Sequence, residues 1–405
     1  MKNKNIFILI IIVMILLAGG VYIVLFSLNK SNTDTEGEGS RFKQFLPFGN
    51  NLTNRNNNES NQEQEVDIDS NFDVTQSQKF QKITNFGIAG AYFSEEIRPL
   101  LDKDDFEIAP SVKYVEKSTG NIYQKYLDNG IEGKISNSPI PSTHEVLISG
   151  DNFIFRYLSS EKTISSFLGS LGEDRGEFLT ENIEEITLSP DESKFFYLAP
   201  FSNGVTGFIR SFGENKTTQV FESPFTEWIS QWVNNDNIYL TTKASYRVKG
   251  YIYKVNIKNK SFEKIFGDIY GLTTLVSPNE NYILYSSGED FGPKLKIYNT
   301  NTREIEDLNL YGLPEKCIWS TNSINIYCAI PNITQKNQPD SWYQGITSFN
   351  DHFVRIDAET GSHLDVNSSF PQENIDAIKL FFDDKENIIF FINKKDSTLW
   401  SLNIK

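Results

Sequence analysis

The residues of this sequence that could do chemistry are few, and their spacing fits no standard catalytic motif. None of the three histidines, His144, His352 and His363, has a second histidine at the spacing of a zinc-protease helix. The sequence contains no Gly-x-Ser-x-Gly nucleophile elbow, no P-loop and no Gly-x-Gly-x-x-Gly loop. We therefore predict no catalytic residue, no metal site and no cofactor.

Carboxylates are the abundant reactive groups. The chain has 405 residues, with 53 Asp and Glu against 38 Lys and Arg, and a formal net charge of −15. Because nucleic-acid binding needs clustered cations, this balance argues against DNA or RNA as a partner. Two facing carboxylates can hydrolyse a glycosidic bond, so a carbohydrate-active enzyme stays an open alternative.

Cys317 and Cys328 are the only cysteines, and their spacing fits a β-hairpin. If the chain turns at Asn322 and Ser323, position 317 faces position 328. Directly opposed residues place their Cβ atoms about 4.5–5.5 Å apart, which small adjustments bring into disulfide range. Such a bond persists outside the cytoplasm. The alternative is a pair of small buried apolar side chains.

A polar insertion follows Cys328. Residues 331–345 are Pro-Asn-Ile-Thr-Gln-Lys-Asn-Gln-Pro-Asp-Ser-Trp-Tyr-Gln-Gly. Long loops on a rigid scaffold often carry function, and Trp and Tyr dominate binding hot spots. We predict that Asp340, Trp342, Tyr343 and Gln344 bind a partner, and that the loop at 169–182 shares their face. The alternative is a lid that packs its own aromatic side chains over the fold.

The elements that position these residues repeat along the chain. A short apolar strand, a polar turn and an aromatic-rich strand recur, and the residues before the turn are 148, 188, 232, 276 and 319. These positions are 40, 44, 44 and 43 residues apart, and a last copy follows 62 residues later, after the insertion. Short strands at a period of about 40–45 residues indicate the blades of a β-propeller. We predict an all-β fold with seven blades, with six as the alternative because the first blade is irregular.

The turns of the two clearest copies are Ser-Pro-Asp at 189–191 and Ser-Pro-Asn at 277–279. Proline presets the backbone for a turn, and Asp or Asn bonds its own main chain. These copies resemble the WD-like repeats of TolB-type bacterial propellers, in which a Ser-Pro-Asp turn joins the first two strands of each blade. Residues 112–123 also resemble uncharacterised membrane-anchored bacterial propeller proteins. Neither resemblance implies a known activity.

The N-terminal segment predicts a membrane anchor. Residues 6–28 run for 23 residues without a charge, long enough as a helix to cross a bilayer. A cleaved signal peptide is the alternative, but the apolar run continues past the small residues at 18–20. Lys2 and Lys4 precede the segment and acidic residues follow it. The positive-inside rule therefore predicts a cytoplasmic N-terminus and an extracytoplasmic propeller.

Between the anchor and the propeller lies a polar linker. Its Asn-, Ser- and Gln-rich composition predicts disorder, which divides the chain into an anchor (1–28), a linker (29–79) and a propeller (80–405). One stretch differs: residues 41–48, Arg-Phe-Lys-Gln-Phe-Leu-Pro-Phe, could rest on a bilayer through Phe42, Phe45 and Leu46. The alternative is an isolated aromatic cluster in a disordered tether.

The last copy of the repeat supplies three strands before the chain ends. We predict that residues 82–86 add the fourth strand, because closing the ring removes its open edges. Taken together, the sequence predicts a membrane-anchored, extracytoplasmic binding scaffold whose partner is a cell-envelope protein or a glycan. The alternatives are a carbohydrate-active enzyme with carboxylates around the central channel, and a purely structural envelope protein.

Overall fold

The computed structural model describes residues 79–99, 105–136, 140–160, 162–173, 176–366 and 374–405. The predicted anchor and the linker up to residue 78 lie outside this part. Among the described residues, no helix is both long and apolar enough to span a membrane.

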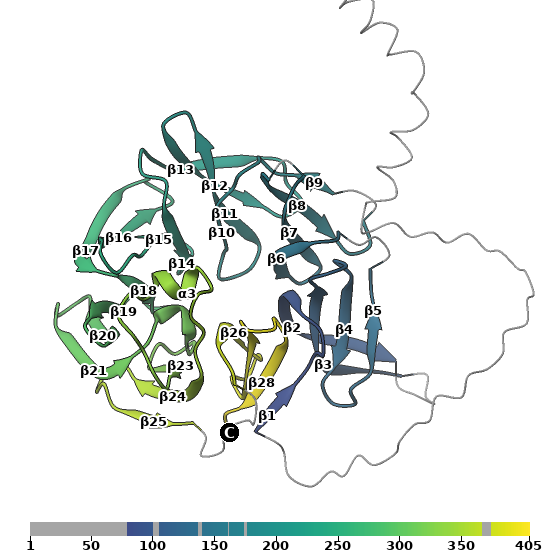
Figure 1. Cartoon of the computed structure of the whole chain (residues 1–405). Coiled ribbons are helices and arrows are strands. Elements are labelled where there is room, and N and C mark those ends of the chain that lie inside the picture. The colour runs from purple at the N-terminus through teal and green to yellow at the C-terminus, as the bar shows by residue number, and fades with distance from the viewer. Residues whose placement is uncertain (1–78, 100–104, 137–139, 161, 174–175, 367–373) are drawn as a thin grey trace, which may run out of the picture.

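The described residues form seven four-stranded antiparallel sheets arranged as a ring (Figure 1). Each sheet is one blade, and in six of the blades chain order gives the strands from the inside of the ring outwards; in the seventh the outermost strand is β1. The predicted seven-bladed β-propeller is thus confirmed.

The first four blades contain these strands. Blade 1 consists of β2 (Ile88–Pro99), β3 (Phe106–Glu116), β4 (Ile122–Tyr126) and β5 (Glu132–Lys134). Blade 2 consists of β6 (Thr143–Ser149), β7 (Asn152–Leu158), β8 (Ile164–Ser170) and β9 (Glu177–Phe178). Blade 3 consists of β10 (Glu185–Leu188), β11 (Lys194–Phe201), β12 (Gly204–Ser211) and β13 (Thr217–Ser223). Blade 4 consists of β14 (Trp228–Trp232), β15 (Asn237–Thr242), β16 (Lys249–Asn256) and β17 (Phe262–Tyr270).

The last three blades include two short helices. Blade 5 consists of β18 (Thr273–Val276), β19 (Tyr282–Glu289), β20 (Gly292–Asn299) and β21 (Ile305–Tyr311). After the 3₁₀-helix η1 (Pro314–Lys316), blade 6 consists of β22 (Cys317–Trp319), β23 (Asn325–Pro331), α3 (Asp340–Tyr343), β24 (Asp351–Asp357) and β25 (His363–Asp365). Blade 7 consists of β26 (Ala377–Phe382), β27 (Ile388–Asn393), β28 (Leu399–Asn403) and β1 (Phe80–Lys82).

The ring closes between the two ends of the described chain. Strand β1 pairs antiparallel with β28, with Phe80 opposite Leu402 and Lys82 opposite Trp400. The predicted closure is correct, but the strand lies a few residues earlier than expected. The ladder ends because the hydroxyl of Thr84 accepts the backbone N–H of Leu399 at 2.9 Å and donates to the carbonyl of Phe86 at 3.0 Å, which turns the chain towards blade 1.

The repeated serine explains why the turn recurs. The backbone N–H of Lys194 donates to the Ser189 hydroxyl at 2.9 Å, and that hydroxyl donates to the Asp191 carboxylate at 2.6 Å. Ser277 makes the equivalent bonds in blade 5, and Ser320 makes them in blade 6. The side chain therefore closes the hairpin between the first two strands of these blades.

The core consists of apolar layers between blades. One layer joins Leu284 and Ile297 of blade 5 to Trp319 and Ile326 of blade 6. Another joins Phe93 of blade 1 to Phe390 of blade 7 across the closure. Because neighbouring blades share these layers, the ring is rigid and its loops are held at fixed positions.

Antiparallel order divides the loops between two faces of the ring. We call the face with the loops between second and third strands, and with the connections between blades, the insertion face. The opposite turn face carries the loops between first and second strands and between third and fourth strands. The connection from β8 to β9 starts on the turn face, where the Leu171 N–H donates to the Asp151 carbonyl at 2.8 Å. The expectation that all of 169–182 shares the insertion face is therefore wrong, and only its end reaches that face.

A candidate binding cavity on the insertion face

Residues 332–350, between β23 and β24, form the insertion, which is the long loop on this face. The segment leaves blade 6 and crosses blade 5, where the Thr334 hydroxyl donates to the Phe291 carbonyl at 2.7 Å. It reaches blade 4, where the Asp340 carboxylate accepts the backbone N–H of Tyr246 at 2.7 Å. The insertion of one blade thus fixes loops of two others.

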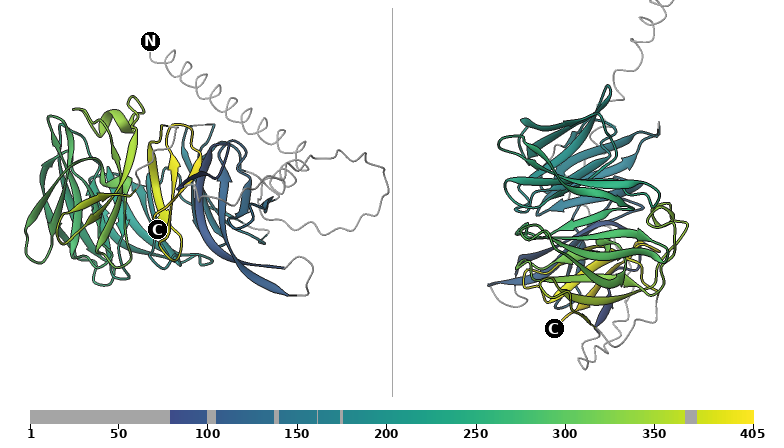
Figure 2. Two further views of the ribbon diagram at one scale, coloured as in Figure 1. Left: turned by 90° about the horizontal axis from the view of Figure 1, so that it is seen from below. Right: turned by 90° about the vertical axis from the view of Figure 1, so that its left-hand side faces the viewer.

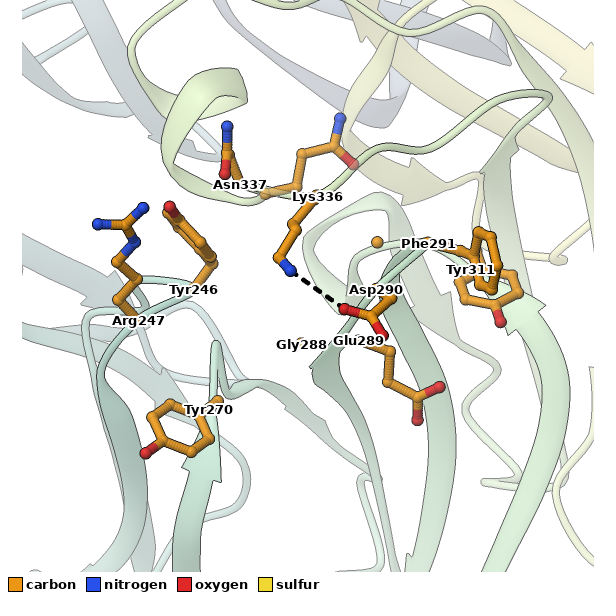
Figure 3. A pocket seen from close by; sticks show the side chains of 12 residues that line it. Tyr246, Arg247, Tyr270, Gly288, Glu289, Asp290, Phe291, Tyr311, Lys336 and Asn337 are labelled. Carbon is orange, nitrogen blue, oxygen red and sulfur yellow. Dashed lines mark hydrogen bonds and ion pairs between the residues drawn. The ribbon is translucent and has the colours of Figure 1, made fainter.

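A cavity of about 930 Å³ lies between these three loops. The β15–β16 loop contributes Tyr246 and Arg247, and Tyr270 stands beside them at the end of β17. Figure 3 shows these side chains on one side, Asp290, Phe291 and Tyr311 on the other, and Lys336 and Asn337 of the insertion between them. The size suits a small ligand or a few residues of a larger partner.

Aromatic surface is open to solvent at this cavity. Tyr270 and Phe291 are exposed, and Tyr246 and Tyr311 are partly buried. Exposed aromatic side chains that surround a hollow are typical of binding sites, because their flat faces bury large areas at low entropic cost. These four rings therefore present the chemistry that the sequence assigned to Trp342 and Tyr343.

Of the two cationic side chains at the cavity, Lys336 has an ionic partner and Arg247 has none among the described residues. Lys336 pairs with Asp290 at 3.1 Å, and both side chains are largely exposed, so solvent screens the pair. The Arg247 guanidinium lies 5.0 Å from the centre of the Tyr246 ring, and it makes no ion pair within the part of the chain that the structure describes. Stacking leaves the guanidinium N–H groups free to donate to an incoming acceptor.

The four binding residues predicted from the sequence do not line the cavity. Trp342 is only 4% exposed and stacks on Phe349 with ring centres 5.8 Å apart. Its indole N–H donates to the Asp376 carboxylate at 3.0 Å. This is the alternative of a lid that packs its own aromatic side chains, so the Trp342 ring is not available to a partner.

The other predicted residues anchor or cap the insertion. Asp340 is occupied by the Tyr246 N–H, and the Tyr343 hydroxyl donates to the Glu315 carboxylate. Burial raises the pKa of both the Tyr343 phenol and the Glu315 carboxyl. Gln344 is exposed, and its backbone N–H donates to the Asp340 carbonyl at 3.0 Å. The side chains of Asp340 and Tyr343 thus fix the insertion that forms one wall of the cavity, whereas Gln344 contributes only its backbone.

A buried charged cluster lies beneath the insertion. Lys316 is fully buried and bonds Asp351 at 2.9 Å and Asp376 at 2.6 Å. Burial raises the pKa of Asp351 to about 6, against the opposing effect of Lys316. Burial also tends to raise the pKa of Asp376. Lys316 and hydrogen bonds such as that from Trp342 outweigh this effect, so the pKa of Asp376 is lowered. The cluster ties η1, β24 and the start of blade 7 to the base of the insertion.

A second group of carboxylates lies on the innermost strands. Burial raises the pKa of Glu185 to about 7, helped by the charge of Glu145 and opposed by hydrogen bonds from Ser230. Burial acts in the same direction on Glu145, but Lys379 and Arg156 outweigh it and lower its pKa to about 2. Neither carboxylate lines the cavity on the insertion face.

A disulfide joins Cys317 and Cys328, which face each other in the β22–β23 register. It links the first two strands of blade 6 close to the point where the insertion begins. Of the histidines, His352 bonds Asn332 at 3.0 Å, and His144 and His363 are exposed. Within the described ranges, no three His, Cys, Asp or Glu side chains are grouped as a metal site.

The repeat itself could have located the cavity. Arg247, Phe291 and Lys336 occupy the loops after the second strand of three successive blades, at spacings of 44 and 45 residues. Composition alone instead points to the most aromatic stretch of the insertion, Trp342 and Tyr343.

Several solved structures resemble this chain at low sequence identity. TolB from Acinetobacter baumannii matches 77% of this chain over 79% of its own, with 10% identity and a TM-score of 0.40. The β-propeller domain of the Trilobed protease from Pyrococcus furiosus matches 78% over 98% of its own, with 14% identity and a TM-score of 0.49. An oligogalacturonate lyase in complex with manganese matches 79% over 99% of its own, with 9% identity and a TM-score of 0.47.

No protein-family model and no curated protein matches the sequence. The resemblance to TolB-type and WD-like propellers therefore concerns architecture, which the seven four-stranded sheets define by themselves.

Proposed function

We propose that this chain is a binding scaffold of the cell envelope and that the cavity on the insertion face is its recognition site. One observation carries the proposal: loops from three successive blades meet around about 930 Å³ of open space. The insertion lengthens one of these loops far beyond what its hairpin needs, and loops held by a rigid scaffold are the usual carriers of binding.

The lining indicates what the partner offers. Tyr270 and Phe291 present exposed ring faces, and Arg247 presents a guanidinium without an ionic partner among the described residues. A partner with flat or apolar surfaces and an anionic group fits this combination. An acidic envelope glycan and an acidic protein segment both meet the description.

Crosslinking mass spectrometry of the full chain in its native membrane tests the proposal. A specific partner should crosslink to the loops at 243–248, 288–292 and 332–350. Replacing Tyr270 and Phe291 together by Ala should weaken capture by about tenfold or more, as expected when hot-spot side chains are truncated. Arg247→Ala should also weaken capture and make it less sensitive to salt.

A matched control keeps the outcome clear. Phe201 is an exposed aromatic residue of blade 3, where β11 ends at the insertion face, and Phe201→Ala should leave capture unchanged. Crosslinks spread over both faces, or capture that survives the Tyr270 and Phe291 changes, would contradict the proposed site. The absence of any crosslinked partner would instead favour the purely structural alternative.

We also propose that residues 6–28 anchor the chain with its N-terminus in the cytoplasm and the propeller outside. The uncharged length of this segment and the lysines before it support the proposal. Protease added to intact cells, from which the cell wall or outer membrane has been removed, should digest the propeller. Protection of the propeller until the membrane is permeabilised would reverse the topology.

A second candidate function is a carbohydrate-active enzyme, as the innermost carboxylates allow. Glu145 and Glu185 lie on the first strands of adjacent blades, with pKa values of about 2 and about 7. An ionised and a protonated carboxyl group side by side is the arrangement that acid–base hydrolysis uses. Glycan screening with wild type and Glu185→Gln decides: turnover lost in the variant supports the enzyme, and no turnover in either removes this candidate.

A further inference from the structure

The first hairpin of blade 1 is much longer than those of the other blades. Strands β2 and β3 have 12 and 11 residues, whereas the first strands of blades 3 and 5 have four. Figure 2 shows the strands of this hairpin projecting from the rest of the ring, on the turn face. The projecting part pairs regularly, with Ile97 opposite Ile108 and Pro99 opposite Phe106.

One side of this projection is apolar and uncovered. Ile97 is 71% exposed, and Phe106 and Ile108 are each 68% exposed. Alternate residues of a strand share a side, so these residues lie on the same side as Phe93, which packs against Phe390 of blade 7. Glu95 also lies on this side, between Phe93 and Ile97, and its carboxylate is 4.0 Å from Lys385 of blade 7. The apolar surface of the projection therefore begins beyond this ion pair, where Ile97, Phe106 and Ile108 are open to solvent.

The other side of the projection is polar and already satisfied. Arg98 bonds the carboxylates of Glu107 and Asp128, and Lys113 bonds Glu96 at 2.8 Å. Only the apolar side therefore lacks a covering element within the described residues. A row of exposed branched and aromatic side chains on a strand pair marks an interaction surface.

Surface chemistry and position indicate what covers it. Glu107 and Asp128 are already paired with Arg98 on the polar side, so a partner that is mainly apolar fits the uncovered side best. Strand β1 is the outer strand of blade 7 and begins at the turn face. The chain therefore enters the ring at Lys79 on the face from which the hairpin projects, in the blade next to blade 1. Within the 78 residues before Lys79, the segment 41–48 combines four large apolar side chains with Arg41 and Lys43 and contains no acid.

We propose that residues 41–48 dock on the apolar side of the blade 1 hairpin formed by Ile97, Phe106 and Ile108. A flexible link of about 30 residues spans roughly 30 Å, which reaches from Lys79 to the neighbouring blade. Attachment to the same chain also raises the local concentration of the segment to the millimolar range. This docking does not depend on the cavity or on what the cavity binds.

Docking would set how the propeller stands on the membrane. Only 12 residues, 29–40, then separate the predicted anchor from the docked segment, a reach of at most about 40 Å. The turn face is held towards the bilayer and the cavity is directed away from it. Release of the segment restores the longer reach of the whole linker.

Site-specific photo-crosslinking of the full chain in liposomes tests this inference. A benzophenone amino acid at Phe45 should crosslink to residues 93–110 of the same molecule, and the same probe at Asn57 should not. Ile97→Ser combined with Ile108→Ser should lower the yield about tenfold, because two exposed isoleucines lose their buried area. Ile305→Ser combined with Leu364→Ser, two exposed apolar residues elsewhere on the ring, should leave the yield unchanged.

Three outcomes would overturn the inference. Crosslinks from position 45 to lipid would make 41–48 a membrane-surface segment. Crosslinks between isotopically light and heavy molecules would make the hairpin a contact between copies. Crosslinks spread over the ring, or insensitive to the Ile97 and Ile108 changes, would show that the hairpin does not select the segment.

Discussion

The Asp340 carboxylate accepts a hydrogen bond from the backbone N–H of Tyr246 at 2.7 Å, although 94 residues separate the two in sequence. Asp340 belongs to the insertion of blade 6 and Tyr246 to a loop of blade 4, with blade 5 between them. A carboxylate that accepts a backbone N–H makes a charge-assisted bond, one of the stronger types in proteins. This single contact therefore holds two walls of the cavity together.

Replacing Asp340 by Ala should loosen that contact without unfolding the ring. We expect a loss of about 1–2 kcal/mol in the free energy of unfolding, the usual cost of removing one partner of a charged hydrogen bond. Hydrogen exchange at 243–248 should accelerate, and this is the measurement that isolates the contact. Gln344→Ala, an exposed neighbour, should change neither quantity; unchanged exchange in the Asp340 variant would show that the insertion is held by other contacts.

Trp342 should behave as a core residue. Trp342→Ala is expected to lower the free energy of unfolding by about 3–5 kcal/mol, the range for truncating a buried aromatic side chain. Phe291→Ala, at the open side of the cavity, should cost less than about 0.5 kcal/mol. Urea unfolding of both variants checks the contrast. A stable Trp342→Ala protein that had lost its partner would restore Trp342 as a binding residue.

The propeller could be predicted because its information is local and repeated. Ser189 and Ser277 each close their own hairpin within five residues, so the turn can be recognised from the sequence of a single repeat. Ser320 closes the same turn without the following proline and aspartate, and only the spacing revealed it. The facing positions of Cys317 and Cys328 follow from the same hairpin geometry.

The cavity could not be predicted in the same way because it depends on contacts between blades. Composition marked Trp342 as a binding residue, but its neighbours Phe349 and Asp376 enclose it. Asp376 is 34 residues away and reaches Trp342 only through the packing of blade 7 against blade 6. Phe291 had no unusual sequence context, and it lines the cavity because the insertion crosses its loop, where Thr334 bonds its carbonyl.

Lys316 should be the residue on which the base of the insertion depends most. Lys316→Met removes the cation from two buried carboxylates, Asp351 and Asp376, and should cost about 3–5 kcal/mol of unfolding free energy. Adding Asp351→Asn and Asp376→Asn should recover part of that loss, since the neutral amides no longer need a counter-charge. Chemical denaturation of the single and triple variants measures the difference. A triple variant no more stable than Lys316→Met would show that packing, not charge, sets the cost.

Glu185 should make the protein less stable as the pH rises. Its pKa is raised from an ordinary 4.5 to about 7, so between these values the folded chain holds a proton that the unfolded chain releases. Unfolding free energy therefore falls across this window, by at most about 3 kcal/mol for a shift of this size. Asp351, with a pKa raised to about 6, adds a smaller fall of the same sign.

Glu185→Gln removes the titration while its amide oxygen can still accept the Ser230 N–H, which donates at 2.7 Å in the wild type. The wild type should lose stability between pH 5 and pH 8, and the variant should lose about 2–3 kcal/mol less. Urea unfolding at the two pH values gives both differences, and Glu184→Gln, an exposed neighbour, should match the wild type. Equal losses in all three proteins would mean that Glu185 is ionised throughout, which would also remove the protonated acid that the second candidate function needs.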